Sequence, residues 1–251
     1  MRRFYIVAAV AVLIWGAVLP VDTALAGGDV RLSVVTTLPD YAVLAKSIGG
    51  DQITVKAIVQ GKQDAHFIRP KPSFVSLVRK TDVLISTGLD LEMWLPTVVD
   101  KSGNTRVRSG RQGYVAAAQG MYLLDKPKAM SRIEGGVHVY GNPHVTTSPI
   151  NMKVAARNIA TGLTQNDPEG KSFYQVGLKL MLDEIDRRLF GPELVKIIGG
   201  DTLCTLAEKG TLIAFLDSQS YQGKPLLEYL GGWMKKMQPL RGKKIVTYHK
   251  N

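Results

Sequence analysis

The chain has 251 residues, of which 45% are hydrophobic and 21% are charged, a balance that excludes disordered and fibrous proteins. Its formal net charge is +11, but basic and acidic residues are interspersed, which predicts a solvated basic face and no nucleic-acid partner. The single cysteine excludes an internal disulfide framework, a thiolate-rich zinc finger and an iron–sulfur cluster.

Residues 1–26 are predicted to be a cleavable export signal. Arg2 and Arg3 precede an apolar run from Tyr5 to Leu19, and an A-x-A pattern follows that ends at Ala26. The alternative is a membrane anchor, but the run is shorter than the ~20 apolar residues that span a bilayer. Because no cysteine lies near the cleavage site, we expect an unlipidated protein, free in a bacterial periplasm or secreted.

Strands and helices alternate in the first half of the mature chain. This spacing predicts βαβ units and an α/β fold whose parallel sheet is covered by helices on both faces. A polar loop over 60–71 separates the second strand from the second helix. Strands are predicted over 31–37, 52–59, 82–87 and 114–118, and helices over 39–48, 72–80 and 91–99.

Helical periodicity dominates the second half of the chain. A loop-like connection over 125–142 comes first, and two helices over 151–163 and 167–189 follow it. The second of these helices is long enough to act as a spacer between two lobes. Shorter helical pieces are predicted over 203–208 and 226–237, and a strand over 243–248.

These patterns predict a two-lobed organisation. We expect a signal peptide over 1–26, an N-terminal α/β lobe over 27–150, a helical linker over 151–190 and the start of a C-terminal lobe over 191–251. The final strand would end without the helix that normally covers it. We therefore expect the chain to be a fragment whose second lobe is incomplete.

Three of the four histidines lie at predicted strand or loop ends. His66 follows the second strand, His144 ends the long connection and His249 follows the last strand. Ligands bind in open α/β folds where loops leave the sheet, so these histidines are candidate metal ligands. Taken singly, each could equally be a surface or turn residue.

Five motifs carry a resemblance to a known family. In chain order they are TTLPDYAVLAKSIGG, DAHFIRPKPS, GLDLEMWL, GNPHVTTSPINMKVAARNIA and VTYHKN. Together they resemble the periplasmic zinc/manganese-binding proteins of ABC importers, from about Val34 to the last residue. The resemblance implies two α/β lobes joined by a long rigid helix, with a metal ion in the cleft between them. It implies His66, His144 and His249 as ligands and a carboxylate ligand beyond Asn251.

The resemblance also bears on the cargo ion. In this family the third position is histidine in zinc members and often Glu in manganese members, and here it is His249. Imidazole nitrogen suits Zn²⁺, whereas Mn²⁺ favours carboxylate oxygen, so Zn²⁺ is the first choice and Mn²⁺ the alternative. Ala65, Thr146 and Thr147 depart from the family pattern without removing a ligand. The implied partner is an ABC permease in the inner membrane, and we expect a monomer.

The remaining polar candidates are interpreted as structural. His138 could be an auxiliary capture ligand, but we expect a solvent-exposed loop histidine. Asp64, Asp90 and Glu92 could be catalytic carboxylates, yet hydrogen-bonded acids at turns and helix starts are commoner. Of these three, Asp64 is expected to orient the loop that carries His66.

An enzyme is the competing function class. Three histidines with an open coordination position also describe the site of a zinc hydrolase. The sequence lacks H-E-x-x-H, G-x-S-x-G and a convincing general base beside the cluster, so we predict a binding protein and no enzyme. Cys204, Trp94 and Trp233 are interpreted as packing residues.

Overall fold

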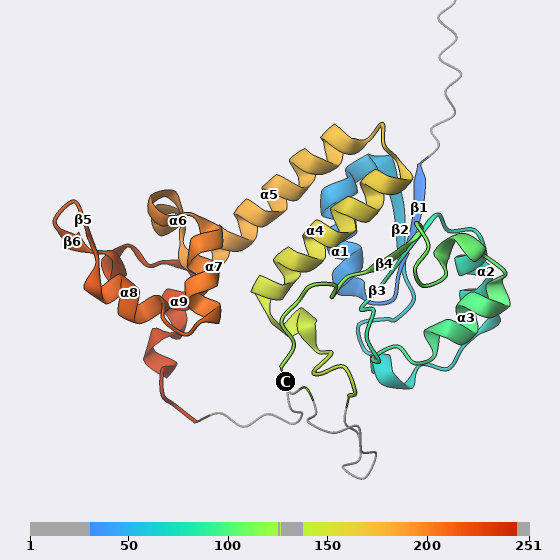
Figure 1. Ribbon diagram of the computed structural model, residues 1–251, viewed down its shortest axis with the longest axis horizontal. Coiled ribbons are helices and arrows are strands. Elements are labelled where there is room, and N and C mark those ends of the chain that lie inside the picture. Colours follow the sequence, from blue (N-terminus) through green and yellow to red (C-terminus); the bar gives the residue numbers. More distant parts are fainter. Residues whose placement is uncertain (1–30, 125, 127–137, 245–251) are drawn as a thin grey trace, which may run out of the picture. The chain divides into compact units, whose positions relative to one another are not determined.

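A computed structural model describes residues 31–124, 126 and 138–244 (Figure 1). The predicted export signal, most of the 125–142 connection and His249 lie outside these described residues, as does all but the first two residues of the predicted last strand. The chain has the predicted α/β architecture, a parallel sheet flanked by helices and followed by a long helix.

The sheet has four parallel strands in the order β2-β1-β3-β4. Val34 in the central strand β1 is in register with Val55 on one side and Val83 on the other. β1 and β3 consist mainly of buried aliphatic residues, as expected for strands covered on both faces. The four predicted strands are confirmed as β1 (Leu32–Thr36), β2 (Ile53–Ala57), β3 (Val83–Ser86) and β4 (Tyr114–Ala116).

Helices lie on both sides of this sheet (Figure 1). α1 (Pro39–Gly49) and α4 (Pro149–Asn166) pack against one another on one side. α2 (Pro72–Arg79) and α3 (Leu95–Ser102) form a pair on the other. Each of these helices has a proline at its first or second position, where the missing N–H has no intrahelical partner to lose.

The helix predicted over 91–99 begins later than expected, at Leu95. Pro96 at its second position favours a helix start there. The preceding side chains of Asp90 and Glu92 are hydrogen-bonded to other segments, which holds residues 88–94 as a turn. Because the helix starts late, Asp90, Glu92 and Trp94 belong to this turn, and their side chains reach the segments that follow the strands.

The long helix α5 (Lys171–Phe190) packs on α1 and α4, and short elements follow it. Two of the helices, α6 and α8, and the β5-β6 hairpin were not predicted, because segments of two to seven residues carry too little periodicity. The elements are α6 (Pro192–Ile198), α7 (Gly200–Glu208), α8 (Leu212–Ser218), β5 (Ser220–Tyr221), β6 (Lys224–Pro225) and α9 (Gly232–Met237), with 3-10 turns at Leu226–Tyr229 and Gln238–Leu240.

A buried ion-pair network joins α4, α5 and α7. Lys153 is 1% exposed, and its Nζ donates to Asp186 Oδ1 at 2.6 Å and to Asp201 Oδ1 at 2.8 Å. Burial alone would lower the pKa of Lys153, but these two hydrogen bonds outweigh burial and hold the pKa above its usual value. Cys204 lies beside this network and is buried, which confirms its interpretation as a packing residue.

Two groups of buried hydrophobic residues form the core of the described chain. One surrounds the sheet and includes Trp94, whereas the other lies among the short helices after Leu189. Trp233 is 48% exposed, so its interpretation as a packing residue is wrong. The boundaries of the two lobes stay a prediction.

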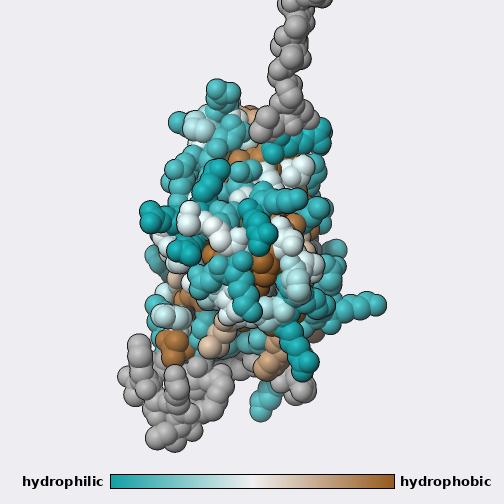
Figure 2. All heavy atoms as spheres, turned by 90° about the vertical axis from the view of Figure 1, so that its right-hand side faces the viewer, coloured by the Kyte–Doolittle hydropathy of each residue, from teal (hydrophilic) through white to brown (hydrophobic). Residues whose placement is uncertain are grey.

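The surface is largely polar on the side that Figure 2 shows, with apolar side chains in small groups among hydrophilic ones. Among residues 31–124, 126 and 138–244, no helix combines the length and the apolar composition needed to cross a bilayer.

Candidate metal centre

The candidate site is built from loops that follow three strands of the sheet, β2, β3 and β4. The 3-10 turn Ala65–Phe67 follows β2, residues 88–94 follow β3, and residues 138–144 belong to the connection that follows β4. The carboxyl ends of parallel strands meet at one edge of a sheet, and this edge is where open α/β folds bind ligands. The topology therefore brings residues far apart in the sequence to one place.

His66 is oriented by the residue two positions before it. Asp64 caps the 3-10 turn, and its Oδ1 accepts hydrogen bonds from the His66 backbone N–H at 2.9 Å and from His66 Nδ1 at 2.7 Å. The expected orienting role of Asp64 is confirmed. Because Nδ1 is held by a carboxylate, the unprotonated lone pair of the neutral ring lies on Nε2.

His144 repeats this arrangement with an amide in place of the carboxylate. Asn142 Oδ1 accepts from the His144 backbone N–H at 3.0 Å and from His144 Nδ1 at 2.8 Å. The His144 carbonyl in turn accepts from the Thr147 hydroxyl at 2.8 Å, at the 3-10 turn Val145–Thr147 that leads into α4. An acceptor for Nδ1–H again leaves Nε2 as the donor atom toward a metal ion.

His138 is oriented from a distant segment. Its Nδ1 lies 3.0 Å from Asp90 Oδ1, and the other oxygen of Asp90 accepts from the Val139 backbone N–H at 3.0 Å. The His138 side chain is only 20% exposed. The expectation of a solvent-exposed loop histidine is therefore wrong, because Asp90 draws the ring in beside the other two.

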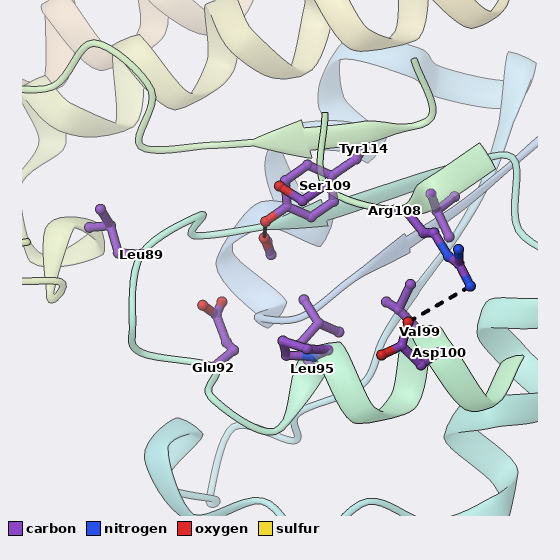
Figure 3. Close-up of a pocket in the computed structure, with 11 residues that line it drawn as sticks. Leu89, Glu92, Leu95, Val99, Asp100, Arg108, Ser109 and Tyr114 are labelled. Atoms are coloured by element: carbon purple, nitrogen blue, oxygen red, sulfur yellow. Dashed lines mark hydrogen bonds and ion pairs between the residues drawn. The ribbon is translucent and has the colours of Figure 1, made fainter. Parts of the chain in front are cut away.

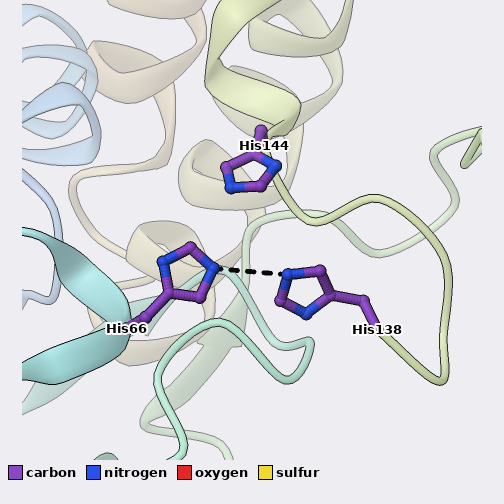
Figure 4. Close-up of side chains that lie close together, drawn as sticks. All are labelled: His66, His138 and His144. Carbon is purple, nitrogen blue, oxygen red and sulfur yellow. Dashed lines mark hydrogen bonds between the residues drawn. The ribbon is translucent and has the colours of Figure 1, made fainter. Parts of the chain in front are cut away.

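The three imidazoles converge (Figure 4). Their ring centroids are separated by 5.2 Å for His66 and His138, 5.3 Å for His66 and His144, and 5.7 Å for His138 and His144. Each ring offers one nitrogen such that all three nitrogens lie within 4.8 Å of one another. No other group of three or more ligand-type residues with this spacing occurs among the described residues.

The separation of the ring nitrogens matches a metal centre. His66 Nε2 and His138 Nε2 lie 3.3 Å apart, although each ring already uses Nδ1 with a carboxylate. Two nitrogens bound to one tetrahedral Zn²⁺ at about 2.0 to 2.1 Å are about 3.3 Å apart. If both Nδ1 atoms donate to their carboxylates, the two Nε2 atoms face one another as acceptors, and a shared cation would stabilise them.

The structure brings together two of the three histidines predicted as ligands, His66 and His144, while His249 lies outside the described residues. The roles of Asn142 and Asp90 were missed. Asn142 had a local signal, since Asp64 and Asn142 both stand two residues before a histidine, a spacing suited to an Asx turn. Asp90 had none, because 48 residues separate it from His138.

Comparisons with known proteins agree on one family. The family described as zinc-uptake complex component A, periplasmic (ZnuA), matches residues 34–188. The manganese ABC transporter substrate-binding lipoprotein PsaA of Streptococcus mitis is 29% identical over 161 residues, covering 62% of this chain and 49% of PsaA. The chain thus spans about half the length of the curated relatives that it matches.

Solved structures give the same result. A crystal structure of a ZnuA deletion mutant with zinc bound is 26% identical and has a TM-score of 0.54, covering 67% of this chain and 58% of that one. A manganese-bound periplasmic metal-binding protein mutant from Candidatus Liberibacter asiaticus has a TM-score of 0.53 at 18% identity, over 66% of this chain and 57% of that one, and supports the fold alone.

Proposed function

The chain belongs to the family of periplasmic zinc-uptake component A proteins, and on that premise we propose that it captures a transition-metal ion, Zn²⁺, for delivery to an ABC-type permease. The permease lies in the inner membrane, and the protein acts as a periplasmic monomer. The proposal also includes two lobes that face one another across the metal ion.

One observation carries this proposal. Each of three clustered imidazoles has its Nδ1 engaged by a side-chain oxygen, of Asp64, Asp90 or Asn142. Such partners fix the tautomer and the ring orientation and raise the basicity of the ligating nitrogen. Surface histidines that serve no common ligand have no reason to share this pattern, so the arrangement supports a prepared metal site.

The donor set favours zinc over manganese. Three imidazole nitrogens suit Zn²⁺, whereas Mn²⁺ binds preferentially where carboxylate oxygens make up more of the coordination. Manganese remains the alternative cargo because the PsaA relative is described as a manganese-binding component. An enzyme is set aside because this is a family of solute-binding components.

Two histidines compete for the third ligand position. The family resemblance assigns it to His249, whereas the geometry supports His138, whose Nε2 lies 3.3 Å from that of His66. We propose that His66 and His144 bind the ion in either case. If His138 is the third ligand, it is one that the family motif does not contain. If His249 is the third ligand, the ligand set is the one that the resemblance implies.

Competition with a chromophoric chelator tests the proposal, because it measures the Kd for Zn²⁺ and for Mn²⁺ in the same assay. His66→Ala and His144→Ala should each weaken zinc binding by at least about tenfold, since each removes a ligand. His138→Ala and His249→Ala then identify the third ligand by which of them weakens binding.

Asp51→Asn is a suitable control, since this exposed acid pairs with Lys46 and lies before β2, at the other end of that strand from the His66 loop. Unchanged zinc affinity in both His66→Ala and His144→Ala would show that the cluster is not the metal site. Tighter binding of Mn²⁺ than of Zn²⁺ would reassign the cargo.

A further inference from the structure

The segment between β3 and α3, residues 88–94, is hydrogen-bonded to the loop that carries His66 and to His138. We propose that Glu92, inside this segment, is a positioning residue of the metal centre: it anchors the segment to the strand ends, and Asp90 and Trp94 transmit that position to His138 and His66. This inference rests on the proposed function for its effect on affinity, but its structural part can be tested without metal.

Glu92 is the anchor because its carboxylate is both buried and highly coordinated. The residue is 4% exposed, and its Oε1 accepts three hydrogen bonds, from the Thr37 hydroxyl at 2.6 Å, the Thr87 hydroxyl at 2.8 Å and the Thr87 backbone N–H at 3.0 Å. Thr37 directly follows β1 and Thr87 directly follows β3. One oxygen atom therefore ties the segment to the ends of the two central strands.

A tyrosine completes this anchor from the opposite helix. The hydroxyl of Tyr41 in α1 donates to Thr87 Oγ1 at 3.1 Å, and Thr87 Oγ1 donates onward to Glu92. Burial raises the pKa of Tyr41, so its hydroxyl stays a neutral donor at all ordinary pH values. The Tyr41 and Thr87 hydroxyls therefore both donate in the direction of the Glu92 carboxylate, which is the final acceptor.

Two residues, Asp90 and Trp94, connect the anchor to the histidines, and each lies two positions from Glu92 in the sequence. Asp90 holds His138 through Nδ1 and the neighbouring Val139 N–H, as described above. On the other side, the indole Nε1 of Trp94 donates to the Ala65 carbonyl at 2.8 Å, and Ala65 directly precedes His66. Trp94 is 6% exposed, so its ring has little freedom to move independently. A shift at Glu92 is therefore passed to both histidines.

The Glu92 carboxylate lies beside a pocket in the packing of the segment. A pocket of about 360 Å³ lies between α3 and the sheet, lined by Leu89, Glu92 and Leu95 among others, and Figure 3 shows the Glu92 side chain directed into it. Leu91 and Trp94 of the segment belong to the hydrophobic core, and Leu89 packs against that core. Metal sites require their ligands to be held within about 0.5 Å, and the hydrogen bonds of Glu92 add directional constraints that apolar packing alone does not supply.

The third histidine supplies an internal control. His144 is oriented by Asn142, within its own loop, and has no hydrogen bond to residues 88–94 among the bonds of the described chain. Loss of the anchor should therefore disturb His66 and His138 and leave His144 unchanged. A general loss of structure would affect all three.

The experiment compares three variants of the whole chain. Glu92→Ala removes the anchor, and Glu92→Gln keeps an acceptor oxygen for the two threonines while removing the charge. Asn104→Ala is the matched structural control, since Asn104, after α3, donates to the carbonyls of Val78 at the end of α2 and of Thr81 before β3, away from the histidines. Each variant is measured by imidazole ¹⁵N–¹H spectra without metal, by thermal unfolding, and by zinc affinity.

For Glu92→Ala we expect the Nδ1–H signals of His66 and His138 to broaden or shift while that of His144 persists, and zinc affinity to fall by about tenfold or more. Glu92→Gln should restore affinity to within about threefold of the parent. Asn104→Ala should lower the Tm without changing affinity.

Two results would overturn the inference. One is a Glu92→Ala variant whose three imidazole signals all match the parent. The other is a loss of affinity no larger than that of Asn104→Ala at an equal loss of Tm. If the parent chain bound no zinc, the proposed function would fail, and the metal-free spectra would still decide whether Glu92 positions the two histidines.

Discussion

The exchange Asp90→Asn tests whether the orientation of His138 matters for metal binding. The Asp90 carboxylate accepts from His138 Nδ1 with one oxygen and from the Val139 N–H with the other, both at 3.0 Å, and its side chain is 16% exposed. Asparagine keeps the shape, but its amide nitrogen cannot accept. One of the two N–H groups must lose its partner, and the negative charge beside the imidazole disappears.

The size of the effect follows from this geometry. Removing a group that orients a metal-bound histidine typically weakens metal binding by about 10- to 100-fold. This range corresponds to about 1.4 to 2.7 kcal/mol of binding free energy. Because Asp90 is largely buried and holds the loop at two points, we expect the loss to reach at least the lower limit.

Chelator competition at constant pH measures this loss, with Asp51→Asn as the control acid. If Asp90→Asn and His138→Ala both bind zinc as tightly as the parent, His138 is not a ligand and the third position belongs elsewhere. If only His138→Ala loses affinity, the ring is a ligand but the argument about its orientation is refuted.

Three further predictions concern protons and buried groups. Acidification from about pH 7.5 to about pH 5.5 should weaken zinc binding, because protons compete with the ion for the imidazole nitrogens; a flat competition curve would contradict the histidine site. Lys153→Met should lower the free energy of unfolding by about 3 to 5 kcal/mol, since it leaves Asp186 buried without its partner. Because the pKa of Lys153 is raised in the fold, this contribution is fully present below the ordinary pKa of 10.5 and is lost as the pH rises through the raised value. Denaturant titrations on both sides of that pH should show the difference in free energy of unfolding between the parent and Lys153→Met becoming smaller. Burial raises the pKa of the Cys204 thiol to about 11, so a disulfide reagent near pH 8 should label it only after unfolding, and rapid labelling of the native chain would show that the thiol is accessible.

The sheet and its first helices could be predicted because their signals are local. The β-branched runs at β1 and β3 and the prolines that open α1 and α2 each mark an element within its own few residues. The start of α3 was displaced because the side chains of the preceding turn are used in contacts that are remote in sequence. Tertiary hydrogen bonds decide such a boundary, and no window of the sequence contains them.

The candidate site divides in the same way. His66 and His144 each stand in a compact motif together with the residue that orients them, so the sequence could identify both. The burial of His138 depends on Asp90, which reaches it only because β3 and β4 are adjacent in the sheet. The anchoring role of Glu92 depends on the strand order for the same reason, since Thr37 and Thr87 lie 50 residues apart in the chain and meet at neighbouring strand ends.

The proposed cargo is argued from the loops and not from the fold. Zinc-bound and manganese-bound proteins share this architecture, and the relatives matched here include a component described for each metal. The sheet supplies the place where the loops meet. Asp64 and Asn142 orient histidines of their own loops, whereas Asp90 orients His138 from another loop. Replacing one imidazole by a carboxylate would shift the donor set toward the preference of Mn²⁺ without altering a strand. In the described part of this chain the three clustered donors are all imidazoles, and the proposal of Zn²⁺ rests on these donors.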